Sequence, residues 1–138
     1  MRSMASGSPA TMRSANILAV EDNEINQHVI SMMLEDMGHT ITLKSNGKEA
    51  VIHLSELETA AYDLIIMDCQ MPIMDGYQAT KKIRAGAGGD AFVDTPIIAL
   101  TANAMKGDRE KCLAVGMNDY LVKPIDQEAL TSTLSNWL

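Results

Sequence analysis

Short apolar runs alternate along this chain with segments in which apolar residues recur every three or four positions. A continuous apolar run of about four residues predicts a strand buried on both faces, as in the centre of a parallel sheet. Apolar residues at three-to-four spacing predict an amphipathic helix. The pattern therefore predicts five strands alternating with five helices. The strands are expected at residues 17–20, 40–43, 64–67, 97–100 and 119–123.

A helix is expected after each strand, and turn residues mark some of the helix ends. Gly38 offers a C-terminal stop for the first helix, and Asp126 can cap the last one. The third and fourth helices are expected near 77–84 and 105–115, and a glycine-rich surface loop at 85–95. The expected apolar stripes of the other three helices are Ile25, Val29, Met32, Met33 and Met37; Val51, Leu54 and Leu57; and Leu130, Leu134 and Leu138.

The apolar pattern also indicates the order of the strands. The first, third and fourth strands are continuously apolar and are expected in the centre, whereas the second alternates and the fifth is short. This matches the order 2-1-3-4-5 of a doubly wound, flavodoxin-like α/β sheet with helices on both faces and right-handed connections. In such a sheet ligands bind beyond the carboxyl ends of the strands, at the switch point between the first and third strands.

Length and composition narrow the class of protein. The 138 residues suffice for one domain, and the 46% apolar content excludes a disordered chain. A net charge of −7 argues against a nucleic-acid or anionic-membrane surface, and the longest apolar run is too short to cross a bilayer. Residues 1–14 lack the apolar core of a secretory signal. We expect a flexible leader or an expression remnant there, and one folded domain at 15–138.

The cysteines and histidines give no sign of a metal site. Cys69 and Cys112 both lie in apolar stretches, so we expect them to be small, reduced core residues of a cytoplasmic protein. The histidines, His28, His39 and His53, share no metal-ligand spacing and are expected to face solvent.

Acidic side chains end two of the central strands. Glu21 and Asp22 follow the first strand and Asp68 follows the third, so the strand order predicts that the three converge. Two like charges about 4 Å apart cost about 4 kcal/mol at a surface-like dielectric, so the cluster should take up a proton or a cation. Carboxylates with room for water suit Mg²⁺. Taken singly, Asp68 could instead cap a turn, and the Glu21–Asp22 pair could favour a helix N-terminus.

Complementary groups end the other two strands of this half of the sheet. Thr101 follows the fourth strand and Lys123 the fifth. A hydroxyl and an ammonium facing a carboxylate–Mg²⁺ cluster suit a transferred phosphoryl group, whose charge spreads over its oxygens. Aspartate is a known nucleophile in aspartyl-phosphate chemistry. The combination favours phosphoryl transfer to Asp68, although each residue alone has an ordinary structural role.

Four segments together resemble the receiver domain of two-component response regulators, and the resemblance covers residues 16–138. The segments are Val20-Glu21-Asp22-Asn23, residues 67–76 from Met67-Asp68 to Asp75-Gly76, Ala99-Leu100-Thr101-Ala102, and Asp119 to Pro124. This resemblance also implies the strand order given above. It implies that Asp68 is the phosphoacceptor, in a domain that catalyses its own aspartyl phosphorylation and dephosphorylation.

The resemblance further implies the roles of the surrounding residues. Asp22 and Asp68 would bind Mg²⁺ directly, Glu21 would do so through water, and the backbone carbonyl of Gln70 would be another ligand. Thr101 and Lys123 would each contact a phosphoryl oxygen. Tyr120 would turn inward when Thr101 moves, and the Lys123–Pro124 peptide bond would be cis.

The finer pattern is similar to the receivers of hybrid sensor histidine kinases, on the segments 21–26, 68–72 and 101–104. It implies a phosphorelay, in which the chain accepts phosphate from a kinase histidine and passes it to a histidine phosphotransfer domain. The location would be the cytoplasm, including the cytoplasmic part of a membrane-bound kinase. Ile25 and His28 are candidate partner contacts, with core packing and a solvated imidazole as the alternatives. A free-standing regulator acting by phosphorylation-dependent protein binding would look much the same.

Other classes fit the residues less well. A flavodoxin-like cofactor binder needs a phosphate-binding loop after the first strand, where the Glu21–Asp22 pair would repel it. A phosphatase of the dehalogenase type needs a second carboxylate where Gln70 stands. A receiver that has lost its chemistry and only docks would not need the full set of strand-end groups found here.

Overall fold

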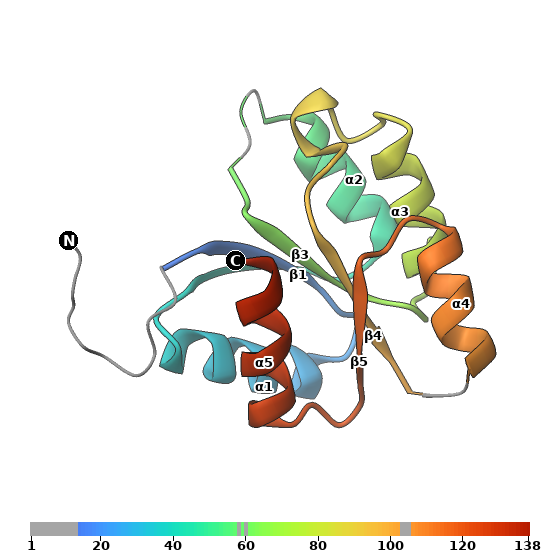
Figure 1. Cartoon of the computed structure of the whole chain (residues 1–138). Coiled ribbons are helices and arrows are strands. Elements are labelled where there is room, and N and C mark those ends of the chain that lie inside the picture. Colours follow the sequence, from blue (N-terminus) through green and yellow to red (C-terminus); the bar gives the residue numbers. More distant parts are fainter. Residues whose placement is uncertain (1–13, 58, 60, 103–105) are drawn as a thin grey trace.

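The computed structural model describes residues 14–57, 59, 61–102 and 106–138, so the leader expected at residues 1–14 lies almost wholly outside the described residues. Strands and helices alternate as predicted (Figure 1). The elements are β1 (Asn16–Val20), α1 (Glu24–Asp36), β2 (Thr40–Lys44), α2 (Gly47–Ser55), β3 (Leu64–Asp68), α3 (Gly76–Arg84), the short 3-10 helix η1 (Asp90–Phe92), β4 (Ile97–Thr101), α4 (Lys106–Ala114), β5 (Asp119–Val122) and α5 (Gln127–Trp137).

The strands form one parallel sheet in the order β2-β1-β3-β4-β5, which confirms the predicted topology. In the register of the two central strands, Val20 of β1 lies opposite Met67 of β3. The residues that end these strands therefore emerge at the same height, on the carboxyl edge of the sheet. None of the helices in the described part of the chain is both long and apolar enough to cross a membrane.

Helices α1 and α5 cover one face of the sheet, and α2, α3 and α4 cover the other (Figure 1). Each face has its own hydrophobic core. Alternate residues of β1, such as Leu18 and Val20, pack with α2, α3 and α4, whereas Ile17 and Ala19 pack with α1 and α5. Because both faces of the central strands are covered, these strands are continuously apolar. The predicted stripes of α2 and α5 are largely correct, and Asp126 caps α5 as expected by accepting a hydrogen bond from the Ala129 N–H.

The predicted buried face of α1 is wrong in part. The helix exists as expected, but its fully buried residues are Ile30 and Leu34, with Met33 and Met37 half-buried beside them. Apolar residues lie around much of the circumference of this helix, so its sequence allows two different buried faces. Packing against α5 and the sheet buries the face that carries Ile30 and Leu34. Three residues of the predicted stripe are exposed, namely Ile25 (74%), Met32 (51%) and Val29 (37%).

The segment 85–95 was predicted to be a surface loop, but part of it is buried in the core. It contains η1, and Phe92 within it is fully buried, with its ring centroid 6.2 Å from that of Tyr62. Arg84 at the end of α3 fastens the segment, because its guanidinium donates to the carbonyl oxygens of Val93 (2.7 Å) and Thr95 (2.8 Å). The only phenylalanine of the chain thus anchors a segment whose glycines suggested a free surface loop.

The prediction that all three histidines face solvent holds for His28 alone. His39 is 5% exposed, and its Nδ1 accepts a hydrogen bond of 3.0 Å from the Ala15 N–H. His53 is half-buried and lies 2.6 Å from the Tyr62 hydroxyl. His39 is buried because the chain enters β1 directly beside the start of β2.

The two cysteines are buried free thiols, as predicted. Their sulfur atoms lie 3.9 Å apart, between the end of β3 and helix α4. Burial raises the pKa of the Cys69 thiol to about 12, which keeps it protonated at neutral pH. Cys69 and Cys112 therefore act as packing residues next to the carboxyl edge of the sheet.

Candidate functional site

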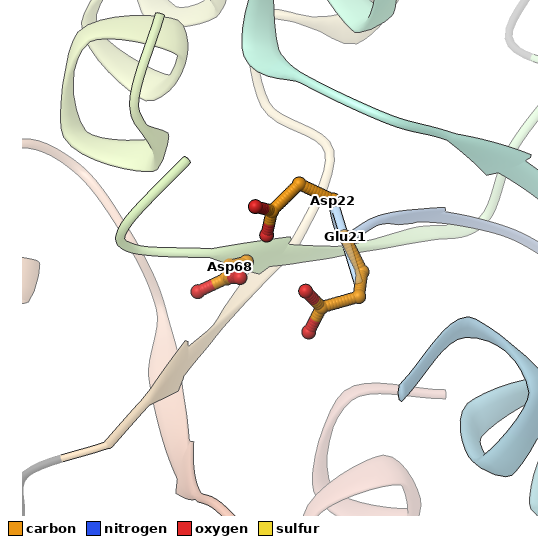
Figure 2. A group of neighbouring side chains, drawn as sticks. All are labelled: Glu21, Asp22 and Asp68. Carbon is orange, nitrogen blue, oxygen red and sulfur yellow. The ribbon is translucent and has the colours of Figure 1, made fainter. Parts of the chain in front are cut away.

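Acidic residues from two neighbouring strands meet at the carboxyl edge of the sheet. Glu21 and Asp22 continue from β1, and Asp68 is the last residue of β3. One carboxylate oxygen of each lies within 4.8 Å of the others, so the three side chains converge as the strand order predicts (Figure 2). Glu21 and Asp68 are buried, whereas Asp22 is exposed. Two of the three carboxylates are therefore shielded from solvent, and the third is open to water.

Lys123 brings a positive charge to this cluster from the end of β5. Its Nζ lies 2.9 Å from Oδ2 of Asp68 and 3.1 Å from Oε1 of Glu21. Burial alone would lower the pKa of the Lys123 ammonium, but its hydrogen bonds and ion pairs with Asp68 and Glu21 outweigh that effect and raise the pKa. Lys123 is thus charged at neutral pH, and its backbone N–H donates to the carbonyl oxygen of Thr101 (2.8 Å).

The loop after β3 folds back over Asp68 and orients it. The Gln70 N–H donates to Oδ1 of Asp68 (3.1 Å), so each oxygen of this carboxylate has one donor among the contacts described. The Gly76 N–H then donates to the carbonyl of Cys69 (3.1 Å). A Cβ at Gly76 would collide with the Asp68 carbonyl oxygen, so only glycine allows α3 to begin this close to the site.

The cluster borders an open crevice of about 240 Å³ at the carboxyl edge of the sheet. It lies at the switch point between β1 and β3, as expected for a doubly wound sheet. The residues that line it are Glu21, Asp22, Asn23, Asn26, Asp68, Cys69, Gln70, Leu100, Ala102 and Lys123.

The other predicted residues lie on β4 and β5, the two strands beyond β3. Thr101 is buried at the end of β4, between Leu100 and Ala102, which line it. Tyr120 of β5 is half-buried, with the guanidinium carbon of Arg109 5.9 Å from its ring centroid. The Lys123–Pro124 bond is cis, as the resemblance implies.

The donor set suits a small divalent cation. Three carboxylates face one ammonium, so an excess of negative charge remains that a cation would neutralise. All the side-chain ligand atoms are oxygens, and the exposure of Asp22 leaves room for water. Mg²⁺ prefers this combination of one or two carboxylates with several waters. The residues present therefore fit Mg²⁺.

The chain belongs to the family of response regulator receiver domains, whose profile matches residues 17–135. It is similar to histidine kinases from several kingdoms: it is 42% identical to "Histidine kinase 1" of Arabidopsis thaliana over 90% of this chain, and 40% identical to "Sensor protein GacS" of Pseudomonas syringae over 95%. The chain spans only 13% and 14% of those two proteins, so it corresponds to one domain of each. It is thus a receiver domain of two-component signalling, related to those of hybrid histidine kinases.

Solved structures agree with this assignment. The receiver domain of sensor histidine kinase PA1611 from Pseudomonas aeruginosa is 47% identical, with a TM-score of 0.79, over 91% of this chain and 98% of that one; it holds a magnesium ion in its active site cleft. The receiver domain of Ssk1 from Saccharomyces cerevisiae, solved in complex with the histidine phosphotransfer protein Ypd1, gives 36% identity and a TM-score of 0.79 over 90% of this chain and 88% of that one.

Proposed function

We propose that this receiver domain, at residues 15–138, is a phosphorelay intermediate in which Asp68 accepts a phosphoryl group from a phosphohistidine. The observation that carries the proposal is the convergence of Glu21, Asp22 and Asp68, with the Lys123 ammonium 2.9 Å from Asp68. Carboxylates alone are common surface features. A buried aspartate that shares a crevice with a cation-binding donor set and a fixed ammonium is suited to phosphoryl transfer.

In the proposed reaction a carboxylate oxygen of Asp68 attacks phosphorus. The new P–O bond forms as the P–N bond to the donor histidine breaks, and the electron pair of that bond stays on the imidazole nitrogen. Lys123 is positioned to neutralise the negative charge of the phosphoryl oxygens. The Gln70 N–H holds Oδ1, so the carboxylate keeps one orientation during attack.

Asp22, Asp68 and the Gln70 carbonyl are proposed to hold Mg²⁺ directly, and Glu21 to do so through water. When bound, the ion supplies positive charge to the phosphoryl oxygens. The magnesium ion in the active site cleft of the related PA1611 receiver supports this proposal. Thr101 is proposed to donate its hydroxyl to a phosphoryl oxygen, and its movement to let Tyr120 turn inward, so that phosphorylation shifts a two-state equilibrium.

The partner surface is proposed on α1. Ile25, Val29 and Met32 recur at positions i, i+4 and i+7, and this stripe is exposed although it is apolar. Val29 also lines a small pocket with Glu21 and Lys123, so the stripe adjoins the acidic site. An exposed apolar helix face suits docking against a helical partner, and the complex of Ssk1 with a histidine phosphotransfer protein supports such a partner here.

The phosphoacceptor is tested by incubating the chain with acetyl phosphate and Mg²⁺ and measuring its intact mass. The wild-type chain should gain one phosphoryl group, labile to alkali as expected of an acyl phosphate, and Asp68→Asn should gain none. Asp126→Asn is the matched control, because Asn also caps a helix and α5 begins outside the crevice. A label of unchanged yield in Asp68→Asn would refute the assignment of Asp68.

The relay is tested by mixing the phosphorylated chain with histidine phosphotransfer domains from the source genome. Rapid transfer to one of them is expected, and Met32→Asp should slow it because a charge would be desolvated in the interface. Leu113→Asp, at an exposed apolar position of α4, is the control and should transfer at the wild-type rate. If the chain keeps its phosphoryl group in the presence of every such domain, the result would favour a free-standing regulator instead.

A further inference from the structure

A glutamine of α1 is bound to the backbone that carries the acidic pair. Nε2 of Gln27 donates a hydrogen bond of 2.6 Å to the carbonyl oxygen of Glu21, and the same nitrogen lies 3.5 Å from Oγ of Ser45. Glu21 has no exposed surface and Gln27 is half-buried. Because little water reaches this carbonyl, the glutamine amide supplies its hydrogen bond.

With this contact, the backbone N–H, the backbone carbonyl and the side-chain carboxylate of Glu21 each have a polar partner. Its N–H donates to the Lys44 carbonyl of β2 (3.0 Å), and its carboxylate meets the Asn23 N–H (3.1 Å) and the Lys123 ammonium (3.1 Å). Those partners fix the position of the Glu21 nitrogen and side chain. Among the contacts described, the direction of its carbonyl group depends on Gln27.

The carbonyl direction matters because of the residue that follows. The carbonyl oxygen of Glu21 and the Cα of Asp22 belong to the same planar peptide group. Fixing the oxygen therefore limits rotation of that plane, and so limits where the Asp22 side chain can point. Gln27 is suited to this task because it lies in the first turn of α1, where its own N–H donates to the Asn23 carbonyl (2.9 Å).

We propose that Gln27 is a positioning residue for the cation site, acting through the Glu21 carbonyl to direct the Asp22 carboxylate toward Asp68. The inference rests on the proposed function, since the cation is the Mg²⁺ of that proposal. Residues that orient metal ligands without touching the metal typically change metal affinity about 10–100-fold when they are lost. Because Gln27 acts through a backbone group, we expect the lower end, about tenfold.

The test is a calorimetric Mg²⁺ titration of Gln27→Met, which keeps the length of the side chain and its helix propensity but removes the donor. Gln127→Met, at an exposed position of α5, is the matched control. Mg²⁺ should bind Gln27→Met about tenfold more weakly than either the wild-type chain or the control. With acetyl phosphate, the half-saturating Mg²⁺ concentration should rise by the same factor, while the rate at saturating Mg²⁺ stays near the wild-type value.

Several results would overturn the inference. One is unchanged Mg²⁺ affinity in Gln27→Met; another is a fall in the saturated rate with an unchanged Mg²⁺ requirement, which indicates a general structural role. If Gln27→Met fails to give the wild-type circular dichroism spectrum, Gln27→Asn replaces it, since its shorter amide cannot span the same distance, and the same tenfold weakening is expected. Absence of Mg²⁺ binding to the wild-type chain itself would contradict the proposed function as well, which separates the two failures.

Discussion

His39 links the start of β2 to the residue that precedes β1, and it can do so only when its Nδ1 is unprotonated. The Ala15 N–H donates to that nitrogen at 3.0 Å, and His39 is 5% exposed. Burial lowers the pKa of His39, and the nearby Asp63 carboxylate opposes this effect only in part. No periodic pattern in the sequence marks this contact, because it joins residues 24 positions apart. The expectation of a solvated imidazole therefore failed.

The lowered pKa of His39 predicts sensitivity to mild acid. In the unfolded chain His39 has its ordinary pKa of about 6.5, so below that pH the unfolded state binds more protons than the folded state. Stability should therefore fall as the pH drops from about 6.5 toward the lower folded pKa. Urea unfolding at about pH 7.5 and about pH 5.5 measures the change. His39→Asn should lose less free energy of unfolding between these two pH values than the wild-type chain does. His28→Asn, at an exposed position, should lose as much as the wild-type chain.

The smaller loss in His39→Asn will not be zero, since burial also lowers the pKa of His53. An equal loss of stability in the wild-type chain and His39→Asn would contradict the proposed origin of the acid sensitivity.

At the scale of the element, α1 shows what an apolar pattern can and cannot establish. The pattern was sufficient to predict a helix and its approximate ends. It did not identify the buried face, because apolar residues occupy both the core side, at Ile30 and Leu34, and the exposed side, at Ile25 and Met32. Only the packing against α5 and the sheet distinguishes them. The residues that misled the prediction are those proposed to bind the partner.

The two faces of α1 should respond differently to truncation. Ile30→Ala removes a fully buried side chain and should lower the free energy of unfolding by about 2–5 kcal/mol. Val29 is the neighbouring residue on the exposed side of the helix. Val29→Ala should change the free energy of unfolding by no more than about 0.5 kcal/mol. Urea unfolding of both variants gives the comparison. Similar losses in the two would show that the assigned orientation of α1 is wrong.

The segment 85–95 is a second element whose sequence was misleading. Its glycines predicted a surface loop, but Phe92 anchors it in the core and Arg84 binds its backbone. Both contacts depend on how α2, α3 and β4 are arranged around the segment. They could not be expected from the local sequence, which gives composition but not neighbours.

At the scale of the whole molecule, the topology was predictable because local apolar patterns indicated it and the resemblance to receiver domains implied the same strand order. Apolar runs marked the central strands, and the parallel sheet then placed the residues that end them on one edge. The convergence of Glu21, Asp22 and Asp68 follows from that order alone. Gln27 could not be found in this way, because its contact with the Glu21 carbonyl involves the backbone and leaves no sequence signature.

The most direct test of the proposed site is whether the acids from β1 and β3 bind one divalent ion together. Mg²⁺ titrations of the wild-type chain, Asp22→Asn, Asp68→Asn and the double variant form a double-mutant cycle. We predict that one Mg²⁺ binds per wild-type chain and that either single substitution weakens its binding more than about tenfold. The double variant should lose much less Mg²⁺ affinity than the product of the two single fold-losses. Unchanged affinity in both single variants, or independent effects that multiply, would contradict a shared site.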